Sequence, residues 1–255
     1  AFAVQSAREC ASYRDEPQLW RTTLARNPDA WLAHHHLGVQ ATNAGRAAEA
    51  IAHHEHILRV RPDDPDEHTN LGNALLAAGR ADGAIRQFEI SLRLKPHAVA
   101  TRTNLGNAFA HLGRLPEAIA CYEEALRLDP NFSIALNNLG SLLVRTGRAG
   151  DAIGCYETAI RANPGNVEAH NNLASVLLQL GRPADAIAHA RTALQLQPHS
   201  AVAHESLAVG LAQTGRLAEA EAAFEAALRL NPNNAHARQN LAQLRASLRA
   251  NPPPK

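Results

Sequence analysis

The feature that most constrains this chain is a sequence repeat with a period of 34 residues. Prolines, leucines, Gly-Arg pairs and alanines each recur at this spacing. The prolines of the series are Pro28, Pro62, Pro96, Pro130, Pro164, Pro198 and Pro232. Several independent series with one period indicate an array of similar structural repeats. A repeat of this size cannot bury its own apolar face, so neighbouring repeats must stack.

Each repeat is predicted to form two helices. Apolar residues in the first half follow helical spacing, as in Leu71, Ala74 and Leu75. A glycine then supplies the left-handed conformation that ends a helix. An acidic residue in the next first turn suits the positive N-terminus of the second helix, which ends at the following proline. A small residue such as Gly72 lets the two axes approach, and a large residue such as Phe88 fills the space between repeats.

This pattern resembles the tetratricopeptide repeat (TPR) family over about residues 14–249. The resemblance implies an all-α fold, a right-handed α-solenoid in which helix-turn-helix repeats wind into a superhelix. Six complete repeats are expected at residues 31–64, 65–98, 99–132, 133–166, 167–200 and 201–234. Residues 1–30 are expected to form an N-terminal helical segment with half a repeat. A capping helix at 235–249 and a disordered tail at 250–255 are expected to follow.

Composition argues against several classes of partner and site. The formal net charge is +1, and the basic residues are scattered, which argues against binding to nucleic acid or to a membrane surface. No run of about 18 apolar residues is present, so we expect no membrane insertion of this segment. Phosphate loops, nucleophile elbows and zinc-protease motifs are absent as well. We therefore predict that the chain is not an enzyme and uses no cofactor.

The residue before the recurrent leucine is asparagine in five of seven places. Asparagine is a poor interior helix residue, so its recurrence needs a reason. One interpretation is structural, with amides that cap or bridge the backbone of neighbouring repeats. The other is binding, because an amide offers a donor and an acceptor that match the main chain of an extended polypeptide. First helices about 10 Å apart would then meet about every third residue of a ligand that rises about 3.3 Å per residue.

We predict a peptide-binding site on the concave face formed by the first helices. Its residues are Asn70, Asn73, Asn104, Asn107, Asn138, Ser141, Asn172, Ser175, Asn240 and Arg145. The strings "NLGN" and "NNLA" resemble the TPR superhelix of O-GlcNAc transferases. That resemblance implies an asparagine ladder that holds a substrate polypeptide. The ladder is interrupted at Ser206, and His36 replaces its first asparagine.

Fourteen histidines raise the question of a metal site. His53 and His56 lie one turn apart on one helix face and form the candidate ligand pair. Equivalent histidines of neighbouring repeats are expected to lie about 10 Å apart, too far to share an ion with bonds of about 2 Å. Packed or solvated imidazoles are the preferred interpretation, so we predict no metal site. Cys121 and Cys155 are expected to be packing residues rather than a disulfide pair.

The leading functional hypothesis is a non-enzymatic scaffold that binds a protein partner, either an extended polypeptide or a helix, in its concave groove. The alternative is the substrate-recognition TPR region of a larger membrane-bound glycosyltransferase-like enzyme. The stretch "YRDEPQLWRTTLARNPDAWLAHHHLG" resembles the junction that precedes the C-terminal TPR region of bacterial membrane proteins related to TPR-bearing O-mannosyltransferases. That alternative implies a location outside the cytoplasm, and the scaffold hypothesis a cytoplasmic one. Self-association through the exposed ends of the array is a third alternative.

Overall fold

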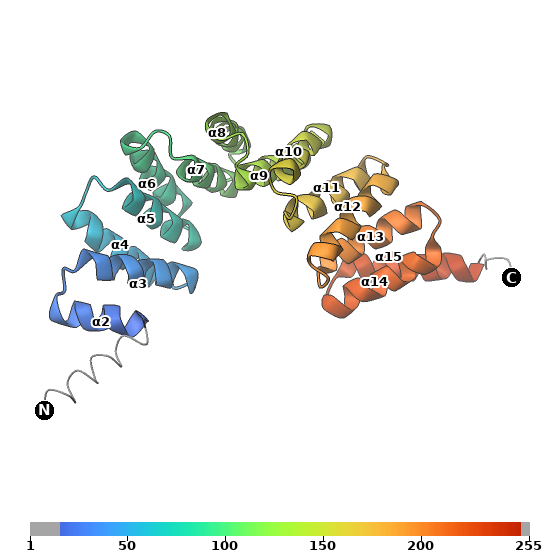
Figure 1. Cartoon of the computed structure of the whole chain (residues 1–255), viewed down its shortest axis with the longest axis horizontal. Helices are drawn as coiled ribbons and strands as arrows, with labels where there is room; N and C mark the ends of the chain where they lie inside the picture. The colour runs from blue at the N-terminus through green and yellow to red at the C-terminus, as the bar shows by residue number, and fades with distance from the viewer. Residues whose placement is uncertain (1–15, 251–255) are drawn as a thin grey trace, which may run out of the picture. The chain divides into compact units, whose positions relative to one another are not determined.

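The computed structural model describes residues 16–250, and this part of the chain contains fourteen α-helices and no strand. In chain order the helices are α2 (Glu16–Arg26), α3 (Trp31–Asn43), α4 (Ala47–Val60), α5 (Pro65–Ala77), α6 (Ala81–Leu94), α7 (Val99–His111), α8 (Leu115–Leu128), α9 (Ser133–Arg145), α10 (Ala149–Ala162), α11 (Val167–Gln179), α12 (Pro183–Leu196), α13 (Ala201–Gln213), α14 (Leu217–Leu230) and α15 (Ala235–Ala250) (Figure 1). The predicted all-α solenoid of helix-turn-helix repeats is confirmed. Residues 1–15 of the expected N-terminal segment (1–30) and residues 251–255 of the expected tail (250–255) lie outside the described residues.

The chain divides into two compact units, an N-terminal unit of residues 1–128 and a C-terminal unit of residues 129–255. Within each unit, every described helix packs against the next one along the chain. The odd-numbered helices, called first helices below, also contact one another: α3 with α5, α5 with α7, α9 with α11, α11 with α13 and α13 with α15. Consecutive second helices, the even-numbered ones, make no such contact within the described part of either unit. First helices therefore line the inner side of each stack.

Each first helix that is followed by a second helix ends at a glycine with positive φ. Gly79 is representative, with φ of 73°. Its N–H donates to the carbonyl of Leu76, and the N–H of Arg80 donates to the carbonyl of Leu75 over 2.8 Å. A Cβ at Gly79 would meet no atom within 4 Å, so backbone conformation alone selects glycine here. The same conformation recurs at Gly45, Gly113, Gly147, Gly181 and Gly215, as the spacing predicts.

A second class of glycine lets an aromatic ring lie directly on the first helix. A Cβ added to Gly72 would come within 2.5 Å of the ring of Phe88, which is fully buried. Gly106 faces Tyr122 in the same way, at 2.6 Å. The predicted close crossing of the two helices is therefore present. It depends on glycine because any side chain at this position would displace the ring.

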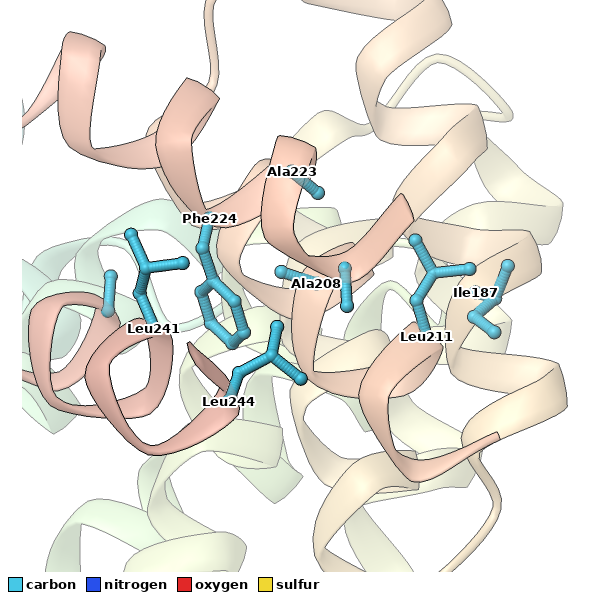
Figure 2. Packing of buried hydrophobic residues seen from close by; sticks show 9 residues of the cluster. Ile187, Ala208, Leu211, Ala223, Phe224, Leu241 and Leu244 are labelled. Atoms are coloured by element: carbon cyan, nitrogen blue, oxygen red, sulfur yellow. The ribbon is translucent and has the colours of Figure 1, made fainter. Parts of the chain in front are cut away.

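In the C-terminal unit the core continues to the last helix through one buried cluster. Figure 2 shows the ring of Phe224 beside Leu241 and Leu244 of α15, with Ala208 of α13 close by. Phe224 is 1% exposed and Leu244 is 7% exposed. Burying one such side chain stabilises a fold by about 1.5–3 kcal/mol relative to leaving it in water. This cluster attaches α15 firmly to α13 and α14.

Candidate functional site

The predicted binding residues occupy two recurrent places on the first helices, the sixth and the ninth residue of each. The sixth positions are His36, Asn70, Asn104, Asn138, Asn172, Ser206 and Asn240. The ninth positions are Val39, Asn73, Asn107, Ser141, Ser175, Val209 and Gln243. The asparagines at both places are half-buried, whereas Ser141 and Ser175 are exposed. All of these asparagine and serine side chains are therefore in contact with solvent.

In the N-terminal unit, two predicted residues meet across neighbouring first helices. Asn104 on α7 donates from Nδ2 to Oδ1 of Asn73 on α5, over 2.9 Å. The side chain of Asn70 makes no hydrogen bond with another residue of the 16–250 range. Neighbouring repeats are therefore bridged at this pair by a hydrogen bond between two side chains. Donors and acceptors remain unused on the same face.

Residues at the ninth position are also held by tyrosines of the second helices. In the N-terminal unit the hydroxyl of Tyr122 donates to Oδ1 of Asn107 over 2.7 Å. In the C-terminal unit the hydroxyls of Tyr156 and Ser141 lie 3.2 Å apart. Burial raises the pKa of Tyr156, so its hydroxyl stays protonated. These contacts with the second helices orient two predicted binding residues, Asn107 and Ser141.

Two members of the sixth-position series, His36 and Ser206, are less accessible to a ligand than the asparagines are. His36 stacks on Trp20 of α2, with ring centroids 4.3 Å apart and an interplanar angle of 4°. Ser206 is 7% exposed.

Arg145 lies at the end of α9, is exposed, and forms no ion pair with a described residue. Among the predicted residues, Arg145 therefore supplies a cation that remains free to meet an anionic group.

Histidines at the fourth position of first helices have a structural use that sequence reasoning missed. Nε2 of His68 lies 2.8 Å from the carbonyl oxygen of Pro62, six residues earlier. The guanidinium of Arg102 donates to the carbonyl of Pro96 over 2.8 Å in the next repeat. The same contact occurs at His34, His170, His204 and Arg238. The available signal was a histidine or an arginine six residues after six of the seven recurrent prolines, Pro130 being the exception because Leu136 follows it.

The two histidines of the candidate metal pair, His53 and His56, both contact His34. Nδ1 of His53 lies 2.8 Å from Nδ1 of His34, and the ring of His56 stacks on His34 with centroids 3.9 Å apart. No group of three or more His, Cys, Asp or Glu residues in the described part of the chain is arranged to hold a metal ion. Burial lowers the pKa of both His34 and His53. These imidazoles pack on one another.

A buried ionisable cluster in the N-terminal unit was also missed. Glu67, the third residue of α5, is 2% exposed and accepts hydrogen bonds from Nδ1 of His54 and Nδ1 of His35. Burial by itself would raise the pKa of Glu67. The hydrogen bonds from His54 and His35 outweigh burial, and the pKa of this carboxyl lies below its ordinary value. His54 replaces the aromatic residue of other repeats, which was the signal available in the sequence.

The cysteines behave as packing residues. Neither Cys121 nor Cys155 forms a disulfide among the described residues. Burial raises the pKa of the Cys121 thiol to about 11, so this thiol is protonated at neutral pH and a poor nucleophile.

Asn240 lines a pocket in the C-terminal unit. The pocket has a volume of about 390 Å³ and lies between α13, α14 and α15. Gln243, the ninth residue of α15, lines it together with Gln213 at the end of α13. Amides of two first helices therefore line part of this pocket.

Residues 2–244 match the family described as the cilia and flagella-associated protein 70 C-terminal domain, a TPR domain. The chain belongs to this TPR family. The comparison with curated proteins gave no match. TPR domains bind protein partners and are generally non-catalytic, so the chain is a protein–protein interaction scaffold.

No described helix combines the length and the apolar character that a membrane span requires.

Solved TPR structures share this fold. YrrB, described as a TPR protein with an unusual peptide-binding site, has 20% identity and a TM-score of 0.60 over 73% of this chain and 96% of its own. The Cut9–Hcn1 hetero-tetramer of APC/C gives 18% identity and a TM-score of 0.74 over 88% of this chain and 45% of its own. A TPR protein from Parabacteroides merdae gives 23% identity and a TM-score of 0.63 over 72% and 73%. These similarities establish the fold, and they do not favour the glycosyltransferase alternative.

Proposed function

We propose that the first helices bind the main chain of an extended polypeptide through the amides at their sixth and ninth positions. The observation that carries this proposal is the hydrogen bond between Asn104 and Asn73. It sets two amides side by side on the inner side of the N-terminal unit. Asparagine has two N–H donors and an accepting oxygen, and Asn104 uses one N–H in this contact. The second N–H and the oxygen of Asn104 remain for a ligand.

The chemistry of this face suits main-chain recognition. Peptide N–H and C=O groups are uncharged and pair with an amide as donor and acceptor together. Each such hydrogen bond adds about 1 kcal/mol net, so several weak contacts along one ligand would give moderate affinity. The peptide-binding site stated for YrrB, a stack of similar fold, supports the same use here.

The proposal is tested with peptides selected from a displayed library of random sequences about 12 residues long, which extend over about 40 Å. Selected peptides are synthesised and titrated calorimetrically against the full chain. Replacing Asn70 and Asn104 together by alanine removes about two hydrogen bonds and is expected to weaken binding about 10- to 30-fold. The helical circular dichroism spectrum is expected to be unchanged, because both side chains are half-buried on helix surfaces.

Asn131→Ala is the matched control, because Asn131 is exposed in the loop before α9. This variant is expected to bind as the wild type does. Unchanged affinity of the Asn70/Asn104 variant for every selected peptide would rule out the proposed role of these amides.

A further inference from the structure

We infer that the C-terminal unit selects an uncharged apolar side chain of the bound polypeptide, in the pocket between α13, α14 and α15. This inference rests on the proposed function and adds the class of residue that the site prefers. The pocket volume of about 390 Å³ is large enough for a leucine or phenylalanine side chain with part of the adjoining main chain. The occupant is therefore a segment of extended chain with one apolar residue inserted.

The floor of the pocket is apolar and rigid. Phe224 and Leu244 line it, and both belong to the buried cluster of α13, α14 and α15 shown in Figure 2. Val209 of α13 lines it as well and is packed against the same cluster. Floor residues that are held in a packed core do not collapse into the cavity, so the cavity is preformed.

The rim carries amides and no charge. Gln213, Asn240 and Gln243 contribute their amides, and no lining residue is ionisable. A carboxylate or ammonium group that entered this pocket would lose hydration without gaining a counter-ion, which is costly. An apolar side chain gains burial instead, and the surrounding amides remain available for the main chain on either side of it.

The apolar floor distinguishes the sixth repeat from the third and fourth repeats, in which a tyrosine hydroxyl contacts the ninth residue of the first helix. In the third repeat the hydroxyl of Tyr122 donates to Asn107, the ninth residue of its first helix, and makes that place polar. The corresponding pair in the sixth repeat is Phe224 and Val209, which have neither the hydroxyl nor the amide. The third repeat thus has a polar pair, Tyr122 and Asn107, at the positions where the sixth repeat has the apolar pair Phe224 and Val209.

The opposite face of α15 differs in chemistry and provides an internal comparison. A groove of about 440 Å³ on that face is lined by Arg238, Arg245 and Arg249. Arg245 is paired there with Glu221 and Glu225 of α14. Preference for an uncharged residue is therefore expected on the inner face alone.

The inference is tested by titrating the full chain with capped peptides of about nine residues. The peptides have leucine, glycine or aspartate at the central position, and all their other residues are identical and uncharged. Binding is followed by the NMR signals of the methyl groups of Val209, Leu217 and Leu244 and of the asparagine side-chain amides. The leucine peptide is expected to bind at least about tenfold tighter than the aspartate peptide and to shift the three sets of methyl signals.

Two variants sharpen the test. Val209→Asn combined with Phe224→Tyr reproduces the Asn107–Tyr122 pair and is expected to reduce the preference for leucine to less than about threefold. Gln213→Lys places a cation at an exposed rim position, where it does not disturb the core, and is expected to shift the preference toward the aspartate peptide by at least about fivefold. The control Ala246→Gln, on the opposite face of α15, is expected to leave all three affinities unchanged.

The outcomes separate this inference from the proposed function. Equal affinities for the leucine and aspartate peptides, with shifted asparagine amide signals, would overturn the inference and leave main-chain binding intact. Absence of any shift with all three peptides would contradict both. A preference for leucine that survives the Gln213→Lys and Val209→Asn/Phe224→Tyr variants would place the selecting pocket elsewhere and also overturn the inference.

Discussion

Nδ1 of His54 donates a hydrogen bond of 2.8 Å to Oε2 of Glu67 inside the N-terminal unit. His54 is fully buried and Glu67 is 2% exposed. His54 lies on the glycine of its own repeat, where a Cβ at Gly38 would come within 2.7 Å of the imidazole. The first repeat therefore has a polar ring where the second, third, fourth and sixth repeats have a buried aromatic one, and the next helix supplies the carboxylate that pairs with Nδ1 of this ring.

Glu67→Gln is expected to destabilise the N-terminal unit by about 1–3 kcal/mol, because it removes a buried acceptor of charge-assisted hydrogen bonds from His54 and His35. The midpoint of urea unfolding measures the change. Glu55→Gln, an exposed change on α4, is the control and is expected to stay within about 0.5 kcal/mol of the wild type.

A compensating pair checks the same reasoning. His54→Phe combined with Glu67→Thr reproduces Phe88 and Thr101 of the following repeats. This double variant is expected to be more stable than Glu67→Thr alone, because it no longer leaves the buried imidazole without its carboxylate. The opposite order of stability would show that His54 does not depend on Glu67.

Stability is expected to fall in acid. Burial lowers the pKa of His34 and His53 below the ordinary value of 6.5, so the folded chain binds these protons less readily than the unfolded chain. Stability is then complete above pH 6.5 and is lost as the pH falls below 6.5 through the lowered values. The lowered pKa of Glu67 acts in the same direction below its ordinary value of 4.5.

Urea midpoints measured from about pH 8 to about pH 5 check this expectation. His53→Gln is the informative variant, because Gln87 already pairs with His68 at 2.7 Å in the next repeat. It is expected to flatten the dependence between about pH 6.5 and about pH 5. A dependence as steep as that of the wild type would assign the acid sensitivity to other groups.

Gly72→Ala is expected to destabilise the N-terminal unit by about 1–3 kcal/mol, because the new methyl group would overlap the ring of Phe88. Gly154→Ala, on α10, adds a methyl group where nothing lies within 4 Å and is expected to stabilise its helix by about 0.5–1 kcal/mol. Thermal melting of both variants measures the contrast. Equal effects of the two substitutions would contradict the crossing described here.

The fourth residue of a first helix contacts the carbonyl of the preceding recurrent proline. This contact predicts that the fold tolerates one substitution of His68 better than another. His68→Arg is expected to cost less than His68→Ala, because an arginine can keep the contact to the Pro62 carbonyl as Arg102 does to that of Pro96. His68→Ala is expected to cost about 1–2 kcal/mol, since it also leaves the half-buried Gln87 without its partner. Urea unfolding of the two variants distinguishes them.

The fold was predictable because its determinants are local and recur. The turn at Gly79 needs a residue that adopts positive φ, and the crossing at Gly72 needs the absence of a side chain. Both requirements leave a periodic mark in the sequence. The pairing of His54 with Glu67 leaves no such mark, because it occurs once and depends on a contact between adjacent repeats. The sequence indicates this pairing only through two departures from the repeat pattern, His54 and Glu67.

The recurrence of asparagine indicates the positions of the candidate site but not the contacts between its side chains. Sequence spacing places Asn73 one turn after Asn70 on the same helix face, where we expected both to be ligand-binding residues. In the structure Asn73 accepts a hydrogen bond from Asn104 of the next first helix. That contact depends on the lateral offset between α5 and α7, which helical periodicity does not determine.

The balance between support and binding at this pair can be measured by a double-mutant cycle on stability. Asn73→Ala, Asn104→Ala and the double variant are compared by urea unfolding. Because both side chains are half-buried, the coupling free energy between them is expected to be about 0.5–1 kcal/mol. A small coupling would mean that the amides can exchange this contact for one with a peptide at little cost to the fold. A coupling above about 2 kcal/mol would identify the pair as a structural bridge and restrict the proposed main-chain contacts to the other asparagines of the series.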